Sequence, residues 1–252
     1  MDYQEFKEAL KSEVEAQLLH DYGDAKENMY CYAIDAGRNA ERLMDVPHEL
    51  HGGFALVARL GNPWAEDGVL KEMSVLVDNQ LMNSWGVDRE TLLKDAMENS
   101  MDKLPATLTP LGGVLEQMTG IPSPDMDVPL YVLTNQASFH GAGTLFYPGQ
   151  MEKIAEEMGS FYVLPSSMHE ILLLPDAARS SVFRNAGDLD TMVQEINNAE
   201  VAPNEILGDH SYHYDRESGM VTIDCREISR LWWWIRLLPR WSGGSLRWLT
   251  PA

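Results

Sequence analysis

The stretch FYVLPSSMHEILLLPD, residues 161–176, indicates the fold of the second half of the chain. It contains two short, mainly apolar runs, 161–164 and 170–174, on either side of Pro165-Ser166-Ser167. Apolar runs of this length that are bounded by Pro and Ser are typical of strands joined by a turn. The stretch therefore predicts two strands of one sheet.

The neighbouring segments extend this pattern in both directions. The runs expected to form strands are 129–134, 143–147, 212–215 and 220–224, and those expected to form helices are 149–158 and a segment that begins at about Asp188. Gly219 lies between the last two strands, where glycine can supply the positive φ of a hairpin turn. Residues 121–225 are thus expected to be an α+β region of ββαββαββ order.

The first 120 residues are expected to be mostly helical. Apolar residues recur every three or four positions over 3–18, which is typical of an amphipathic helix. Asp88 has the character of an N-cap, and a helix over 111–118 is expected to end at Gly120. Residues 73–77 predict a strand, while the apolar run 54–60 fits either a helix or a strand.

Three prolines within 120–129 favour a domain boundary there. The predicted fold class is α+β, with a mostly helical N-terminal part followed by a mixed, largely antiparallel sheet with two helices. The predicted domains are 1–120, 121–225 and an atypical tail over 226–252.

The composition excludes several classes of protein. Hydrophobic residues make up 44% of the 252 residues, enough to bury a core, so the chain as a whole is not disordered. It has no apolar run of 18 residues, and its first residues do not resemble a secretory signal. Its two cysteines, Cys31 and Cys225, cannot form a disulfide framework and suit a reducing compartment. We therefore expect a cytoplasmic protein.

The net charge of −20 is unevenly distributed. Residues 226–252 carry +4, so the rest of the chain carries −24. Such an acidic body disfavours direct binding to nucleic acid, but it can attract a basic partner, including a DNA-binding protein. The simpler alternative is that the charge only keeps the protein soluble.

The tail has a composition of its own. Residues 231–252 hold five of the seven tryptophans and neither Lys nor acid. One hypothesis is attachment to a membrane surface, and another is contact with a protein partner, since Trp and Arg are frequent anchors in both settings. The candidate interaction residues are Trp232, Trp233, Trp234, Arg236 and Trp241. An accidental terminus is the alternative.

A possible metal site lies in DVPHELH, residues 45–51. Its histidines are one residue closer than in the zinc motif HExxH, which places two imidazoles on one helical face. Asp45, His48 and His51 are the candidate ligands, and the alternative is that His48 packs or caps at the start of a helix.

A possible hydrolytic site lies in residues 166–170, where Ser166, Ser167, His169 and Glu170 offer a nucleophile, a base and a carboxylate. Neighbours in sequence rarely fold into a triad, and the G-x-S-x-G elbow is missing. A turn with serine hydroxyls bonded to the local backbone is the alternative. Phosphate-binding, dinucleotide-binding, CxxC and EF-hand motifs are also missing, so no cofactor is expected.

Several long strings resemble an uncharacterised bacterial family, domain-of-unknown-function family 5688. They are ERLMDVPHEL at 41–50, WGVDRETLLKDAMENS at 85–100, PLYVLTN at 129–135, LFYPGQMEKIAEEMG at 145–159, the stretch 161–176 and EINNAEVAPNEILGDHSYHYDRESG at 195–219. The resemblance covers roughly residues 30–220 and implies no particular activity, cofactor or catalytic residue. It also implies that the N-terminal region 1–120 is shortened, relative to the family, between its first helix and Tyr30.

The sequence thus leaves the function unknown and favours a non-enzymatic, acidic interaction or regulatory protein of the bacterial cytoplasm. One alternative is a hydrolase that uses His48 and His51 with a metal, or Ser166, Ser167 and His169 without one. Another alternative is attachment to a membrane surface through residues 231–248.

Overall fold

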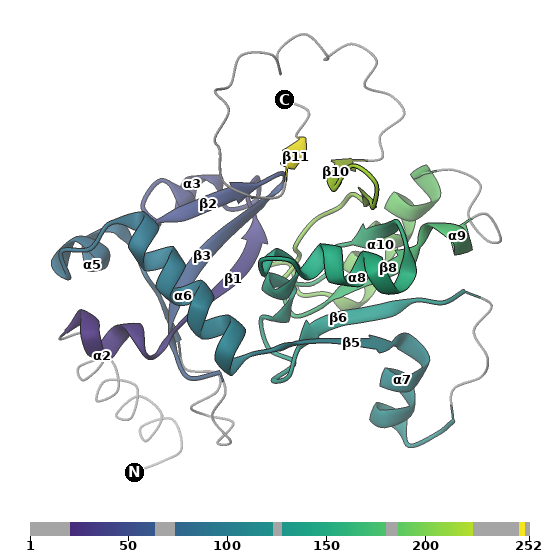
Figure 1. Ribbon diagram of the computed structural model, residues 1–252, viewed down its shortest axis with the longest axis horizontal. Coiled ribbons are helices and arrows are strands. Elements are labelled where there is room, and N and C mark those ends of the chain that lie inside the picture. The colour runs from purple at the N-terminus through teal and green to yellow at the C-terminus, as the bar shows by residue number, and fades with distance from the viewer. Residues whose placement is uncertain (1–20, 64–73, 123–127, 180–185, 224–246, 250–252) are drawn as a thin grey trace, which may run out of the picture.

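The computed structural model describes residues 21–63, 74–122, 128–179, 186–223 and 247–249. The expected amphipathic helix over 3–18 and the tail residues Trp232, Trp233, Trp234, Arg236 and Trp241 lie outside these ranges. The described residues form an α+β structure in which two sheets stand side by side (Figure 1). The predicted α+β class, with a largely antiparallel sheet, is therefore confirmed.

The first sheet has four strands, all antiparallel. β3 (Phe54–Gly61) pairs along its length with β1 (Met29–Asp35) on one side, and with β2 (His48–His51) and then β4 (Ser74–Leu76) on the other. The helices around this sheet are α2 (Tyr22–Lys26), α3 (Ala40–Leu43), α5 (Asn79–Ser84) and α6 (Arg89–Lys103). α6 begins where the sequence predicts, because the carboxylate of Asp88 accepts a hydrogen bond from the backbone of Thr91 at 2.8 Å.

This sheet is the main feature of the N-terminal region that the sequence did not predict. β1 is buried on both faces, so its residues do not alternate between apolar and polar and give no strand signal. The ambiguous run 54–60 is also a strand, and because all of its residues except Arg59 are buried, its pattern did not distinguish a strand from a helix. The described part of residues 1–120 thus combines helices with a sheet instead of being mostly helical.

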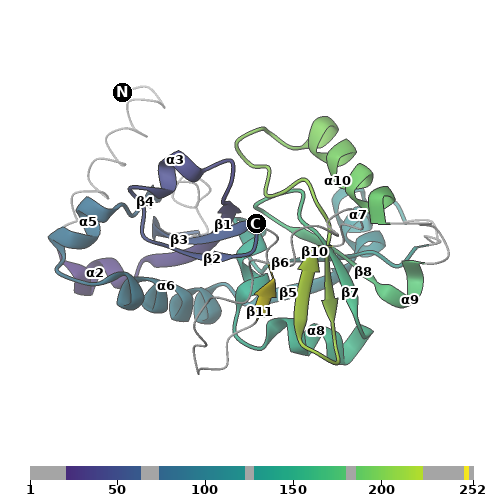
Figure 2. The ribbon, with the colours of Figure 1, turned by 90° about the horizontal axis from the view of Figure 1, so that it is seen from above.

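The second sheet has seven strands in the order β11-β10-β9-β7-β8-β6-β5, antiparallel except where β10 meets β11. The strands are β5 (Ala106–Pro110), β6 (Tyr131–Asn135), β7 (Phe161–Leu164), β8 (Ile171–Pro175), β9 (Tyr212–Asp215), β10 (Met220–Ile223) and β11 (Arg247–Leu249). The helices are α7 (Leu111–Thr119), α8 (Gln150–Met158), α9 (Asp176–Arg179) and α10 (Ala186–Glu200). α8 and α10 cover opposite faces of this sheet (Figure 2).

Most elements predicted for this half are confirmed, including the two strands around Pro165 and the hairpin in which Gly219 has φ of +63°. α7 also ends as predicted, at Gly120 with φ of +69°. β5 and β6 pair with each other from either side of 120–129, so this segment connects neighbours in one sheet. The division of the chain into domains at residue 120 stays a prediction.

The predicted strand over 143–147 is wrong, because Gly141–Phe146 forms a buried 3-10 helix, η1. Its two glycines allow very close packing. A Cβ atom on Gly143 would lie 3.1 Å from the Cα of Tyr32, and one on Gly141 would lie 2.6 Å from the backbone nitrogen of Asn135. η1 therefore fits between the two sheets, where a strand with larger side chains would not.

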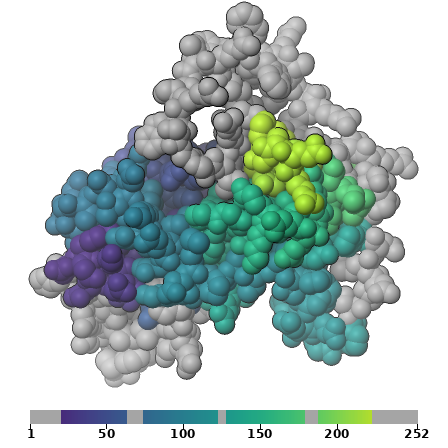
Figure 3. Space-filling view, in the orientation of Figure 1, coloured from purple at the N-terminus to yellow at the C-terminus, as the bar shows by residue number. Residues whose placement is uncertain are grey.

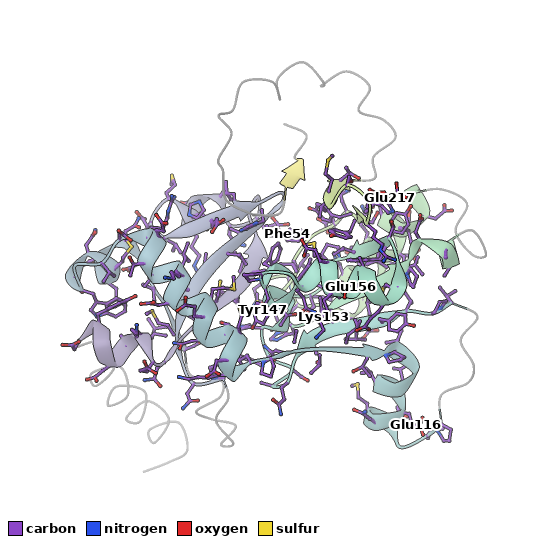
Figure 4. The ribbon with its side chains drawn as sticks, in the orientation of Figure 1. Phe54, Glu116, Tyr147, Lys153, Glu156 and Glu217 are labelled. Atoms are coloured by element: carbon purple, nitrogen blue, oxygen red, sulfur yellow. The ribbon has the colours of Figure 1, made fainter. Side chains whose placement is uncertain are left out.

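η1 makes one continuous core of the two halves. Leu145 and Phe146 belong to the same buried cluster as residues of β1, α6, α8 and β7. The hydroxyl of Tyr147, just after η1, lies 3.0 Å from the backbone oxygens of both Ser100 and Leu104 at the end of α6 (Figure 4). Among the described residues, no helix is long and apolar enough to cross a membrane.

Candidate functional site

The candidate metal ligands do not converge. His48 and His51 lie in strand β2, where residues three apart face opposite sides of the sheet. The Nδ1 of His48 donates to the backbone oxygen of Val46 at 2.8 Å, and the Nε2 of His51 lies 3.3 Å from a carboxylate oxygen of Glu49. Within the described ranges, no three His, Cys, Asp or Glu side chains are placed to hold a metal ion, so zinc binding by Asp45, His48 and His51 stays a prediction.

The candidate hydrolytic residues lie together in the loop between β7 and β8, but not as a catalytic triad. The hydroxyl of Ser167 accepts a hydrogen bond from the backbone N–H of His169 at 3.0 Å. Both serines are only 5% exposed, and Ser166 bonds through its backbone to Leu207. Burial raises the pKa of Glu170. This is the turn with local hydroxyl bonds that the sequence offered as the alternative, and a serine-type reaction stays a prediction.

His169 takes part in a larger group of rings that the sequence did not reveal. We call this group the His140 cluster, and its members are Tyr30, Tyr32, Phe139, His140 and His169. The His140 ring stacks with those of Tyr32 and His169, whose centroids are 4.7 Å and 5.3 Å away. Its Nδ1 is 3.0 Å from the hydroxyl of Tyr30. The cluster therefore joins strand β1 of the first sheet to two loops of the second.

The loop that carries His140 has an unusual backbone. Ser138 and His140 have φ of +51° and +50°, a region that non-glycine residues rarely occupy. Asn135, which is 2% exposed, holds this loop. Its amide nitrogen donates to the oxygen of Phe139 at 2.8 Å, and its amide oxygen accepts from the N–H groups of Ala137 and Phe139 at 3.0 and 3.3 Å. Strained backbone that is held this firmly is often found at functional sites.

Arg59 on β3 adds a positive charge beside the cluster. It is partly buried, and its guanidinium lies 5.4 Å from the ring centroid of Tyr32, whose hydroxyl accepts a hydrogen bond from Nη1 at 3.3 Å. Its other bonds go to Ser74 on β4: Nε donates to the hydroxyl at 2.8 Å and Nη2 to the backbone oxygen at 2.9 Å. These contacts place a fixed guanidinium at one end of the His140 cluster.

The electrostatics of the cluster favour neutral rings. Burial lowers the pKa of His140 to about 3, and the charges of Arg59 and His169 lower it in the same direction. Burial raises the pKa of Tyr30 to about 12, although Arg59 and Ser74 oppose this change. At neutral pH, His140 is therefore an uncharged imidazole, which can form hydrogen bonds but adds no positive charge.

A second candidate surface is the solvent face of α10. Residues 186–210 contain six acidic residues and neither Lys nor Arg. Asp188, Glu195 and Glu200 are exposed on this helix, while Leu189 and Val193 are buried against the second sheet. Asp190 has a local role, because its carboxylate accepts from the backbone and hydroxyl of Ser211.

α8 offers an acidic surface for comparison. Glu152, Glu156 and Glu157 are exposed there, but Lys153 lies among them (Figure 4). In the space-filling view, α8 lies beside the β9–β10 hairpin, which carries both Arg216 and Glu217 (Figure 3). The charge of this surface is therefore mixed, whereas α10 itself carries no Lys or Arg, and Arg38 contacts this region at Asp209, beyond the end of the helix.

Sequence reasoning missed the His140 cluster because its members come from segments about 110 residues apart. One signal was present in the string SFHGAG, residues 138–143, where two glycines follow a histidine. The glycines indicated only a turn, and nothing in the sequence placed Tyr30 and Tyr32 against it. Arg59 likewise gave no signal, since it is a single charged residue within an otherwise apolar strand.

The fold defines a class of α+β proteins with two antiparallel sheets that share one core across a buried 3-10 helix. Comparison with family models gives a match over residues 1–216 to a family of unknown function, DUF5688. Because the match spans most of the chain, the chain belongs to this family, and the family resemblance of the sequence is confirmed. No curated protein and no solved structure matches it, so the comparisons indicate no specific function.

Proposed function

We propose that this chain is a non-enzymatic interaction protein that binds a positively charged protein through the solvent face of α10. The observation that carries the proposal is the stretch 186–210, with six acids and no Lys or Arg. Its exposed side chains include Asp188, Glu195 and Glu200. A surface of one sign attracts an oppositely charged partner over a distance of about one Debye length, roughly 8–10 Å at physiological salt.

The net charge and the cysteines of the chain restrict the class of partner and the compartment. A net charge of −20 repels nucleic acid, so the partner is a basic protein, such as the basic surface of a DNA-binding protein. A reducing compartment such as the bacterial cytoplasm suits the chain, because it has only two cysteines and Cys31 is a buried free thiol.

The test compares two double variants with the same change in net charge. Glu195→Gln with Glu200→Gln alters α10, and Glu156→Gln with Glu157→Gln alters α8. A fluorescent polylysine peptide titrated at 50 mM salt reports affinity for a cationic chain. We expect the α10 variant to weaken binding about three- to tenfold, since each exposed ion pair contributes up to about 1 kcal/mol. We expect a smaller change for the α8 variant.

A pull-down from bacterial lysate then tests partner choice. Full-length wild-type protein should retain a basic protein that the α10 variant loses and the α8 variant keeps. Equal loss of polylysine affinity in both variants would mean that only total charge matters, and the assignment to α10 would be refuted.

A further inference from the structure

Arg59 is unusual among the charged groups of this acidic chain. The guanidinium has five N–H groups, and its hydrogen bonds to described residues go to the side chain and backbone of Ser74 and to the hydroxyl of Tyr32. No carboxylate of the described residues forms an ion pair with it. Arg38, by contrast, lies close to the carboxylates of both Asp35 and Asp209. Within the described parts of the chain, Arg59 is thus a partly buried cation without a counterion, although the sequence has about twice as many acids as bases.

The groups around Arg59 fix it in place without neutralising it. Its Nε and Nη2 bond to Ser74, so the guanidinium plane is held at the junction of β3 and β4. Tyr32 lies on one side of it, and the hydroxyl of Tyr30 is close enough to be affected by its charge. His140, bonded to Tyr30, is uncharged at neutral pH. All the neighbours named here are neutral hydrogen-bonding groups.

We propose that Arg59, with the hydroxyls of Tyr32 and Ser74 beside it, is a binding site for an oxyanion, the carboxylate or phosphate group of a small ligand. A guanidinium presents parallel N–H groups that match two oxygens of a carboxylate or phosphate, and the N–H groups of Arg59 that make no hydrogen bond to the described residues supply this contact. Partial burial strengthens the attraction because water screens it less.

This site is independent of the acidic face of α10. It lies on the first sheet, whereas α10 packs on the second, and it binds an anion instead of a cation. The surrounding negative charge of the chain selects against large polyanions, so the site favours a small ligand with one or two charges. The rings of Tyr32 and His140 lie close to the bound anion and can report on its presence.

The experiment uses the full chain and three salts at equal ionic strength: sodium phosphate, sodium acetate and sodium chloride. NMR spectra of the aromatic and histidine ring protons follow each titration. We expect saturable shifts of the Tyr32 and His140 signals with phosphate or with acetate, and none with chloride. A response to phosphate assigns a phosphate ligand, and a response to acetate assigns a carboxylate ligand.

Variants of Arg59 decide whether the arginine is responsible. Arg59→Gln should abolish the saturable shifts, and Arg59→Lys, which keeps the charge but loses the paired N–H groups, should weaken binding about tenfold. Arg89→Gln removes an exposed arginine from α6 and should leave the affinity unchanged. Circular dichroism checks folding, and Arg59→Lys serves alone if Arg59→Gln does not fold. The proposal is overturned if neither phosphate nor acetate gives saturable shifts, or if the Arg59 variants bind as the wild type does.

Discussion

Replacing Asn135, a buried residue at the start of the loop that carries His140, with alanine should destabilise the protein strongly. Its buried side chain makes three hydrogen bonds to the backbone of Ala137 and Phe139. Each such bond contributes about 0.5–1.5 kcal/mol net, and the freed backbone groups are only partly able to reach water. We therefore expect Asn135→Ala to lower the free energy of unfolding by about 2–4 kcal/mol. For a chain of this size, the melting temperature should fall by about 5–15 °C.

The measurement is equilibrium unfolding in urea, followed by circular dichroism, for wild type and variant. Asn198→Ala, at an exposed position on α10, is the matched control and should change the free energy of unfolding by less than about 0.5 kcal/mol. The loop of the His140 cluster should also rearrange, because Ser138 and His140 would lose the support for their positive φ. A loss below about 1 kcal/mol would refute the view that Asn135 holds this loop.

Three further predictions concern the same region. Tyr147→Phe should cost about 1–2 kcal/mol in urea unfolding, because buried carbonyls at the end of α6 lose their donor. Gly141→Ala should cost about 1–3 kcal/mol or more, since its Cβ would lie 2.6–2.7 Å from the backbone of Asn135 and His169, and a wild-type melting temperature would contradict this. The pKa of His140 is about 3 in the folded state and near 6.5 in the unfolded state. The contribution of the neutral ring to the free energy of unfolding is therefore complete above pH 6.5 and is lost as the pH falls towards 3. His140→Asn should therefore reduce the slope of unfolding free energy against pH between 4.5 and 6 by about 1.4 kcal/mol per unit, and parallel slopes would show that His140 does not titrate this way.

The candidate sites show what local sequence patterns can predict about a functional site and what they cannot. The sequence identified histidines and serines that are neighbours in the chain, but strand β2 turns His48 and His51 to opposite faces. In the loop after β7, the hydroxyl of Ser167 bonds to backbone instead of the ring of His169. The groups that do meet, Tyr30 and His140, are 110 residues apart, and no pattern in one sequence relates them.

The sequence by itself determined the α+β class, the family, the acidic charge, most elements of the second half, the start of α6 and the end of α7. These features follow from local causes: apolar periodicity, a capping carboxylate at Asp88 and a left-handed residue at Gly120. Only the tertiary structure decided that 29–35 is a strand and that 141–146 is a 3-10 helix. Both segments are buried on all sides, so their conformation depends on what packs against them, and it was this packing that brought Arg59, Tyr32 and His140 together.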